Sequence, residues 1–180
     1  PETYSFWDLH VAIQDSMGWK DCHLHMFKLI DPKTGHKVRI DIPVEVDEFE
    51  DSDEVILMDY QTYISNYFTP TNTKAVYEYD FGDGWTHDIE FEGVFPKLPR
   101  LRYPKCIGGE RSCPPEDCGS SSGYEELVEA MKNPKHPRRK EFLEWLGFEY
   151  HPDLFKPEYV CFDNPRERWE MAFGKDAHGF

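Results

Sequence analysis

The sequence lacks any run of apolar residues near the length of about 20 that a membrane-spanning helix needs. It also lacks a charged-then-apolar leader followed by a small-residue cleavage site. Both absences argue against a membrane or secretory route. We therefore expect a cytoplasmic protein with no membrane partner.

Basic residues are scarce relative to acidic ones. Lysine and arginine number 20 and aspartate and glutamate 35, which gives a formal net charge of −15. Such a charge repels the phosphate backbone that supplies most non-specific affinity for nucleic acid. The one basic cluster, Arg138-Arg139-Lys140, is more typical of a solvated helix face. Non-specific nucleic-acid binding is therefore disfavoured, and a protein partner is the better expectation.

The cysteines are few and odd in number, which does not suit a disulfide framework. The five cysteines are an odd number, and no leader directs the chain to an oxidising compartment. Reduced thiols or a metal site remain as the two interpretations.

The first half of the chain predicts one helix and two hairpins. Ser5 and Asp8 form a capping-box pattern before apolar residues at helical spacing, which end at Gly18. Residues 22–30 alternate, and a turn leads them into residues 37–42. Residues 45–54 hold seven acids in ten positions and predict a mobile surface loop. A short helix is expected over 61–68, and the Asp-Gly pair at 83–84 predicts a hairpin joining 75–81 to 85–95.

The second half predicts helices. Ser122 and Glu125 suggest a capping box for a helix that Pro134 ends. Pro137 is expected to begin another, with Phe142, Leu143, Trp145 and Leu146 facing inward, and a last helix is predicted over 165–173. The chain is therefore predicted to be one α+β domain over residues 1–180, with a mostly antiparallel sheet built from hairpins, an N-terminal helix and a C-terminal helical pair.

The segment from Cys106 to Tyr124, which we call the cysteine segment, is rich in cysteine, proline and glycine. This composition predicts an irregular loop with a defined conformation. Cys113 and Cys118 have a spacing that zinc sites tolerate, with Cys106 as a possible third ligand and His87 as a fourth. Only one short pair is present, however, so we favour structural thiols and no cofactor. In that case Glu116 and Asp117 should accept hydrogen bonds from amides of the loop or the helix start.

Histidines near the N-terminus suggest a second possible metal site. His23 and His25 should lie on one face of a strand about 6.6 Å apart. His10 should join them if the first helix packs on the hairpin. A hydrogen-bonded histidine at a helix–sheet contact is the favoured alternative, because histidine is commonly half-buried without being a ligand.

The turn at residues 80–88 gathers acids around an imidazole. Asp80, Asp83 and His87 could hold a cation and activate water in a metal-dependent hydrolase. Turns also favour aspartate and glycine for backbone reasons alone. Trp85 fits a cross-strand packing role better than a substrate platform.

Several motifs resemble one known family. Asp-Phe-Gly-Asp-Gly-Trp-x-His at 80–87, Cys-Pro-Pro-Glu-Asp-Cys-Gly at 113–119, Met-Gly-Trp at 17–19 and His-Leu-His-x-Phe at 23–27 are similar to the plasmid open-reading-frame-three family, named after a root-inducing plasmid. The resemblance implies a first strand before Pro1, so we expect a fragment lacking that strand. Members are often labelled transposon-passenger resolvase-like, but no serine here lies in the arginine-rich site that a serine recombinase needs.

The leading functional interpretation is a non-enzymatic module that binds a protein partner through the acidic loop and the face around the cysteine segment. The expected binding residues are Asp83, Trp85, His87, Glu116 and Asp117. The alternative is a metal-dependent hydrolase of a phosphorylated or nucleotide substrate.

Overall fold

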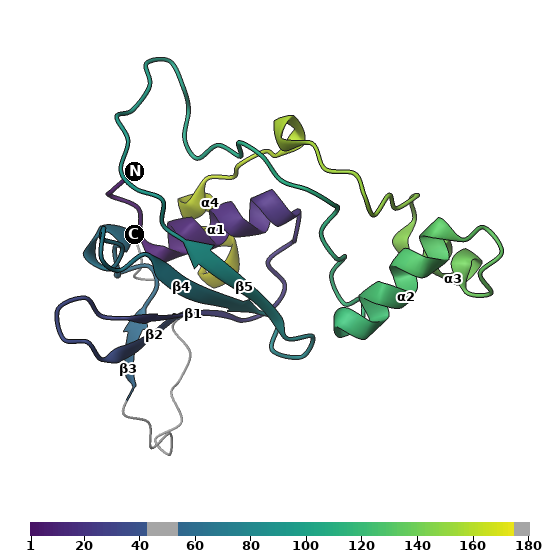
Figure 1. Cartoon of the computed structure of the whole chain (residues 1–180), viewed down its shortest axis with the longest axis horizontal. Coiled ribbons are helices and arrows are strands. Elements are labelled where there is room, and N and C mark those ends of the chain that lie inside the picture. Colours follow the sequence, from purple (N-terminus) through teal and green to yellow (C-terminus); the bar gives the residue numbers. More distant parts are fainter. Residues whose placement is uncertain (43–53, 175–180) are drawn as a thin grey trace.

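A computed structural model describes residues 1–42 and 54–174. Its centre is a five-stranded sheet in the order β3-β2-β1-β4-β5 (Figure 1). The strands are β1 (His25–Ile30), β2 (Lys37–Asp41), β3 (Val55–Met58), β4 (Lys74–Tyr79) and β5 (Trp85–Glu90). The predicted acidic loop, apart from Glu54, lies outside the described residues.

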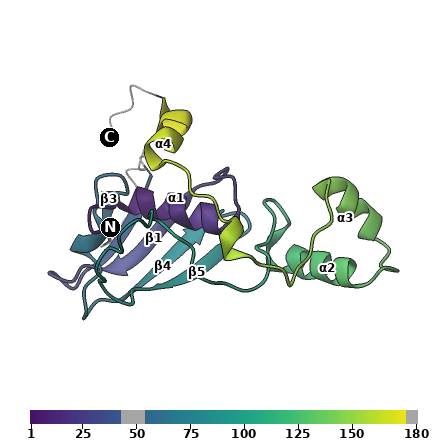
Figure 2. The ribbon, with the colours of Figure 1, turned by 90° about the horizontal axis from the view of Figure 1, so that it is seen from above.

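The first helix, α1 (Phe6–Met17), lies across one face of the sheet (Figure 2). Ser5 caps its start: the Ser5 hydroxyl accepts from the Asp8 amide, and the Asp8 carboxylate accepts from the Ser5 amide, which confirms the predicted capping box. Gly18 ends the helix in the left-handed conformation that glycine adopts without strain. Phe6 of α1 enters the core with an edge-on contact to Phe27.

Strand alternation decides which side chains face α1. In β1 the side chains of His25, Phe27 and Leu29 are buried, and those between them are more exposed. In β4 the same holds for Ala75, Tyr77 and Tyr79. This face forms the main core, as the alternation in the sequence predicts.

The β4–β5 hairpin is confirmed, with Tyr79 paired to Trp85 at its closing end. Two details of the prediction are wrong. β4 ends at Tyr79 because Asp80 has a left-handed backbone, which leaves Phe81 in the turn and 48% exposed. β5 ends at Glu90, short of Phe95.

Strand β3 is absent from the sequence prediction. It pairs in parallel with β2, with Val38 opposite Val55, whereas every other pairing in the sheet is antiparallel. The predicted short helix over 61–68 is a single 3₁₀ turn, η1 (Ile64–Asn66). The sheet is therefore mostly antiparallel, as expected, with one parallel edge.

Two further helices, α2 (Ser120–Lys132) and α3 (Arg139–Leu146), project from the sheet as an arm (Figures 1 and 2). The arm has its own small core of Leu127, Ala130, Met131, Phe142 and Tyr150. The predicted helical pair is thus confirmed, together with the α+β fold.

The details of the arm differ from the prediction. Helix α2 starts two residues before Ser122, after Gly119, and no side chain caps it. Helix α3 starts at Arg139 rather than Pro137. Trp145 does not face inward: it is 47% exposed, because Phe142 fills the small contact with α2.

The last helix, α4 (Pro165–Phe173), begins where the sequence predicts and is capped by Asn164. It covers the side of α1 that faces away from the sheet, where Trp169 meets Trp7 edge-on. Residues 147–164 lead from α3 back to α4, and we call them the return segment; it contains a second 3₁₀ turn, η2 (Pro157–Tyr159). Across the residues that the structure describes, none of the helices has the length and apolar character needed to cross a bilayer.

Candidate functional site

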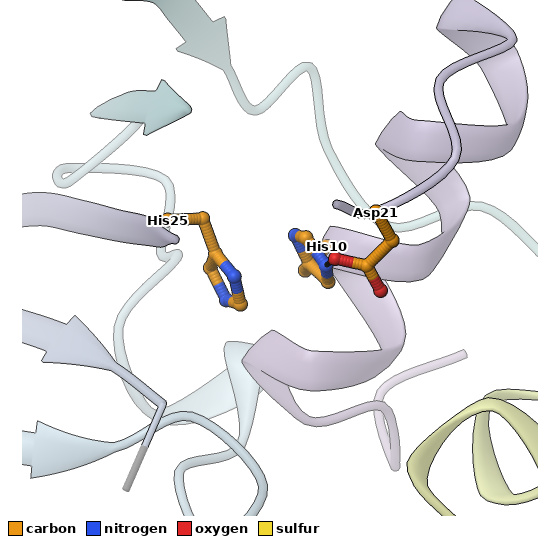
Figure 3. A group of neighbouring side chains, drawn as sticks. All are labelled: His10, Asp21 and His25. Carbon is orange, nitrogen blue, oxygen red and sulfur yellow. Dashed lines mark hydrogen bonds and ion pairs between the residues drawn. The ribbon is translucent and has the colours of Figure 1, made fainter. Parts of the chain in front are cut away.

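Between α1 and the sheet lies a buried network of polar side chains built around two histidines. The imidazole rings of His10 and His25 stack with centroids 3.5 Å apart and an interplanar angle of 9°. His10 comes from α1, His25 from β1, and Asp21 reaches His10 from the connection between them (Figure 3). Both rings are buried from solvent.

Hydrogen-bond directions in this network fix the protonation of His10. The Gln14 amide donates to the Tyr77 hydroxyl, which leaves the hydroxyl proton for His10 Nδ1 at 2.9 Å. His10 Nε2 then carries the ring proton and donates to Asp21 at 2.8 Å. Burial, and next the neighbouring His25, lower the pKa of His10 to about 3. His10 is therefore neutral at physiological pH.

The second ring has its own carboxylate partner. His25 Nε2 lies 3.0 Å from Asp59 Oδ2, and the other oxygen of Asp59 accepts the Tyr60 amide. Burial raises the pKa of Asp59, although the hydrogen bond from His25 opposes that shift. Each histidine of the stack thus has a carboxylate that fixes its orientation.

The stacked geometry does not suit a metal shared by the two rings. A metal bound to an imidazole lies near the plane of that ring, and two nearly parallel planes about 3.5 Å apart share no such point. Donor atoms of His10, Asp21 and His25 do lie within 4.8 Å of one another, but the parallel rings still leave no position for one metal in both ring planes. The favoured expectation, hydrogen-bonded histidines at a helix–sheet contact, describes this pair.

His23 does not join that pair, contrary to the alternative that grouped it with His10 and His25. β1 begins at His25, so strand alternation does not extend back to His23. His23 Nε2 instead lies 3.1 Å from Asp117, 3.6 Å from Asp80 and 3.9 Å from Glu116. We call these four residues the acidic–histidine cluster.

The residues of the hydrolase alternative serve separate contacts. Asp80 Oδ1 accepts the amides of Gly82 and Asp83 and so holds the turn. Asp83 accepts the Gly119 amide with a carboxylate oxygen and the Ser120 hydroxyl with its carbonyl, which ties the turn to the start of α2. His87 lies beside the rings of Trp19 and Tyr77, and burial lowers its pKa. Within the described residues, His87 belongs to no group of three metal-binding side chains.

The cysteines also form no such group in the part of the chain that the structure describes. Cys113 packs against the main core, Cys118 is buried, and Cys106 is hydrogen-bonded to the carbonyl of Gly108. Burial raises the pKa of the Cys113 thiol, and that of Cys118 to about 11. These contacts are those of thiols packed or hydrogen-bonded within the protein, as the structural interpretation expects.

Glu116 and Asp117 make different contacts from those expected. Glu116 Oε1 accepts the amide of Lys20, which lies in the connection after α1 and not in the cysteine segment, and the Tyr79 hydroxyl lies within hydrogen-bond distance of both Glu116 oxygens. Asp117 contacts His23 rather than the start of α2. Asp83 accepts from the helix start instead: its carboxylate accepts the amide of Gly119, the left-handed residue that precedes α2.

Trp85 is half-buried and packs against the main core, with its ring near those of Trp19 and Tyr124. It therefore connects the sheet with α2 and has the packing role expected of it.

We call the sheet together with α1 and α4 the sheet body. A groove of about 710 Å³ lies where the arm meets this body. Its walls come from the end of α1, the cysteine segment from Ser112 to Asp117, the end of α3 and the return segment. Its exposed apolar side chains are those of Trp145, Phe148, Leu154 and Tyr159. Glu116 and Asp117 line the same groove, so two of the five predicted binding residues are there; Asp83, Trp85 and His87 are not.

The partners of the stacked histidines were missed by the sequence interpretation. Asp21, Asp59 and Tyr77 lie up to 67 residues from the histidines that they contact, and Gln14 joins the network through Tyr77. The sequence could have indicated only Tyr77 among these partners, because the alternation in β4 predicts that its side chain faces the core.

Comparisons with known proteins identify the family of this chain but indicate no activity. The chain is 36% identical over 150 residues to the uncharacterized protein y4hQ of Sinorhizobium fredii, which covers 82% of this chain and 70% of y4hQ. It is 39% identical to a protein of unknown function, MM3350 of Methanosarcina mazei Go1, whose crystal structure superposes with a TM-score of 0.79 over 90% of this chain and 86% of that one. The plasmid pRiA4b ORF-3-like family matches residues 1–159. The chain therefore belongs to the plasmid pRiA4b ORF-3-like protein family.

Proposed function

We propose that this protein is a cytoplasmic, non-enzymatic binding module whose ligand is a cationic segment of another protein. The observation that carries the proposal is the groove between the sheet body and the arm, lined by the cysteine segment on one side and by exposed aromatic and aliphatic side chains on the other. Its volume of about 710 Å³ is within the range of about 300–1,000 Å³ typical of ligand sites.

The apolar wall supplies the affinity in this proposal. Trp145, Phe148 and Leu154 are 47%, 60% and 48% exposed, which is unusual for neighbouring large apolar residues on one small surface. Tryptophan and tyrosine are also the side chains that most often dominate binding energies at protein interfaces. An apolar or aromatic side chain of the partner would cover this wall.

Charge supplies the selectivity. Glu116 and Asp117 line the groove, and within the described residues neither forms a salt bridge with a lysine or arginine. The net charge of −15 extends the same preference over a longer range and opposes nucleic acid as a ligand. A partner segment with lysine or arginine beside an apolar residue satisfies both requirements.

A selection from random dodecapeptides displayed on phage tests this function. Peptides that combine basic and aromatic or aliphatic residues should be enriched on the full chain. Their binding should weaken about tenfold in Trp145→Ala, a loss of about 1.4 kcal/mol, and should weaken when the salt concentration rises.

Phe95→Ala is the matched control, because Phe95 is 75% exposed and lies outside the groove. Equal loss in Phe95→Ala and Trp145→Ala, or enrichment of acidic peptides, would contradict the proposed function.

A further inference from the structure

The acidic–histidine cluster collects three carboxylates around one imidazole nitrogen. His23 precedes β1, Asp80 follows β4, and Glu116 and Asp117 come from the cysteine segment. Within the described residues, no lysine or arginine forms a salt bridge with any of the three acids. The cluster thus concentrates negative charge where three distant segments of the chain meet.

The nitrogen at the centre of the cluster is buried but is not hydrogen-bonded. His23 Nε2 is shielded from solvent and makes no hydrogen bond of acceptable geometry, although Asp117 lies only 3.1 Å away. The N–H axis is therefore not directed at Asp117, and Asp80 and Glu116 lie beyond hydrogen-bond distance. A cation between the imidazole and the carboxylates would give this buried nitrogen a partner.

Two of the carboxylates are held so that one oxygen is fixed and the other faces His23. Asp80 Oδ1 is occupied by the amides of Gly82 and Asp83, and Asp80 Oδ2 faces the imidazole. Glu116 Oε1 accepts the Lys20 amide, the Tyr79 hydroxyl lies 2.9 Å from Oε1 and 3.2 Å from Oε2, and Oε2 faces the imidazole. Hydrogen bonds of this kind orient ligands in metal sites.

The distances match those between ligands of a bound metal. With metal–ligand bonds of about 2.0–2.2 Å, two ligands of a tetrahedral centre lie about 3.4 Å apart. The contacts of His23 Nε2 at 3.1, 3.6 and 3.9 Å bracket this value. Donor atoms of His23, Asp80 and Asp117 also lie within 4.8 Å of one another, and Glu116 Oε2 lies beside this group, 3.9 Å from His23 Nε2.

We propose that His23, Asp80, Asp117 and Glu116 bind a first-row divalent cation. One imidazole with several carboxylates suits Mn²⁺ and Zn²⁺ better than Ca²⁺, which takes oxygen ligands alone. The cation joins the turn of the β4–β5 hairpin, at Asp80, to the cysteine segment at Asp117, three residues before α2 begins. It therefore fixes the base of the arm through carboxylates, without using the cysteine thiols.

The test is a Mn²⁺ titration of the EDTA-treated full chain, followed by electron paramagnetic resonance and by thermal unfolding. Mn²⁺ is used because it binds carboxylates in preference to thiolates. The wild-type chain should bind one equivalent and gain thermal stability. His23→Gln and Asp80→Asn should each lower the affinity by about 100-fold. Asparagine at position 80 tolerates the left-handed backbone and can still accept the two turn amides, so that variant should fold.

Matched controls are His36→Gln and Asp88→Asn, which remove the same groups at exposed positions outside the cluster. Both should bind Mn²⁺ as the wild type does. Failure of the wild type to bind at millimolar Mn²⁺ would overturn the proposal. Loss of binding in Cys113→Ser together with retention in His23→Gln would also overturn it, by assigning the metal to the thiols. Glu116 and Asp117 also line the peptide groove, but the metal measurements use no peptide, and the varied residues His23 and Asp80 lie outside the groove lining, so the two proposals fail separately.

Discussion

The sheet body and the helical arm are stabilised in different ways. In the body, α1 lies between the sheet and α4, so its side chains are buried on two sides, and even its polar His10 and Gln14 are fully buried with partners. In the arm, α2 and α3 enclose one small cluster, and tyrosine hydroxyls tie it to backbone carbonyls of the cysteine segment. The body thus depends on interior packing, whereas the position of the arm depends on a few hydrogen bonds at its base.

The largest expected effect is a core truncation in the body. Phe27 is fully buried among Phe6, His25 and Tyr77. Phe27→Ala should lower the free energy of unfolding by about 3–5 kcal/mol, because it removes a large apolar side chain and leaves a cavity. Urea unfolding followed by circular dichroism measures this. A loss below about 1 kcal/mol would show that the body is not the stable part of the molecule.

Gly123→Ala should disturb the junction between the two regions. In an ordinary helix this change stabilises by about 0.5–1 kcal/mol. Here a Cβ at position 123 would lie 2.0 Å from the Cys118 carbonyl oxygen, so the start of α2 must shift. We expect a loss of about 1–3 kcal/mol, concentrated in the amide exchange protection of α2.

Gly108→Ala is the control, since a Cβ there meets nothing within 4 Å. A stabilising Gly123→Ala would show that the loop around Cys118 moves freely with the helix.

Acidification should weaken the body more than the arm. The pKa of His10 is lowered to about 3, primarily by burial, whereas the unfolded value is about 6.5. The folded state therefore binds fewer protons, and stability present above pH 6.5 is lost as the pH falls toward 3. Between pH 7 and pH 5 the loss from His10 is about 2 kcal/mol, reduced in part by Asp59, whose raised pKa acts in the opposite direction.

Urea unfolding at the two pH values measures this effect, and His10→Gln should show a shallower pH dependence than the wild type. An unchanged dependence in His10→Gln would assign the acid sensitivity to another group. Amide protection in α2 should change least, since no histidine contributes to its core cluster.

The smallest expected effect is at the arm's tether. The Tyr150 hydroxyl donates to the carbonyls of Ser112 and Cys113. Tyr150→Phe keeps the ring in the arm cluster but removes these bonds, at a cost of about 1 kcal/mol. Faster proteolysis of the cysteine segment with unchanged protection of β1 and β4 is the expected result. Equal loss of protection in the strands would mean that arm and body unfold as one unit.

The sequence predicts features that depend on local patterns. The capping box at Ser5, the alternation in β1 and β4 and the start of α4 at Pro165 all agree with the structure. Strand β3 was missed because Val55–Met58 is a four-residue apolar run without alternation, and its parallel partner is distant in sequence.

The candidate sites depend on contacts that no local pattern encodes. His23 and His25 are two residues apart, but β1 begins only at His25. His25 therefore lies in the stacked pair, whereas His23 lies in the acidic–histidine cluster. The capping box predicted at Ser122 is not formed, again because of a contact that is distant in sequence: Asp83 of the β4–β5 hairpin accepts hydrogen bonds from Gly119 and Ser120 at the start of α2. Long-range hydrogen bonds, more than propensity, decide both outcomes.

The exposed indole of Trp145 has an optical consequence. The other four tryptophans, at positions 7, 19, 85 and 169, are buried or half-buried in the body, so Trp145 is the one fluorophore of its kind on the arm. Its emission should lie to the red of the others and should be the most accessible to a soluble quencher such as acrylamide. The unlabelled protein thus carries an intrinsic reporter that distinguishes a covered arm from an open one.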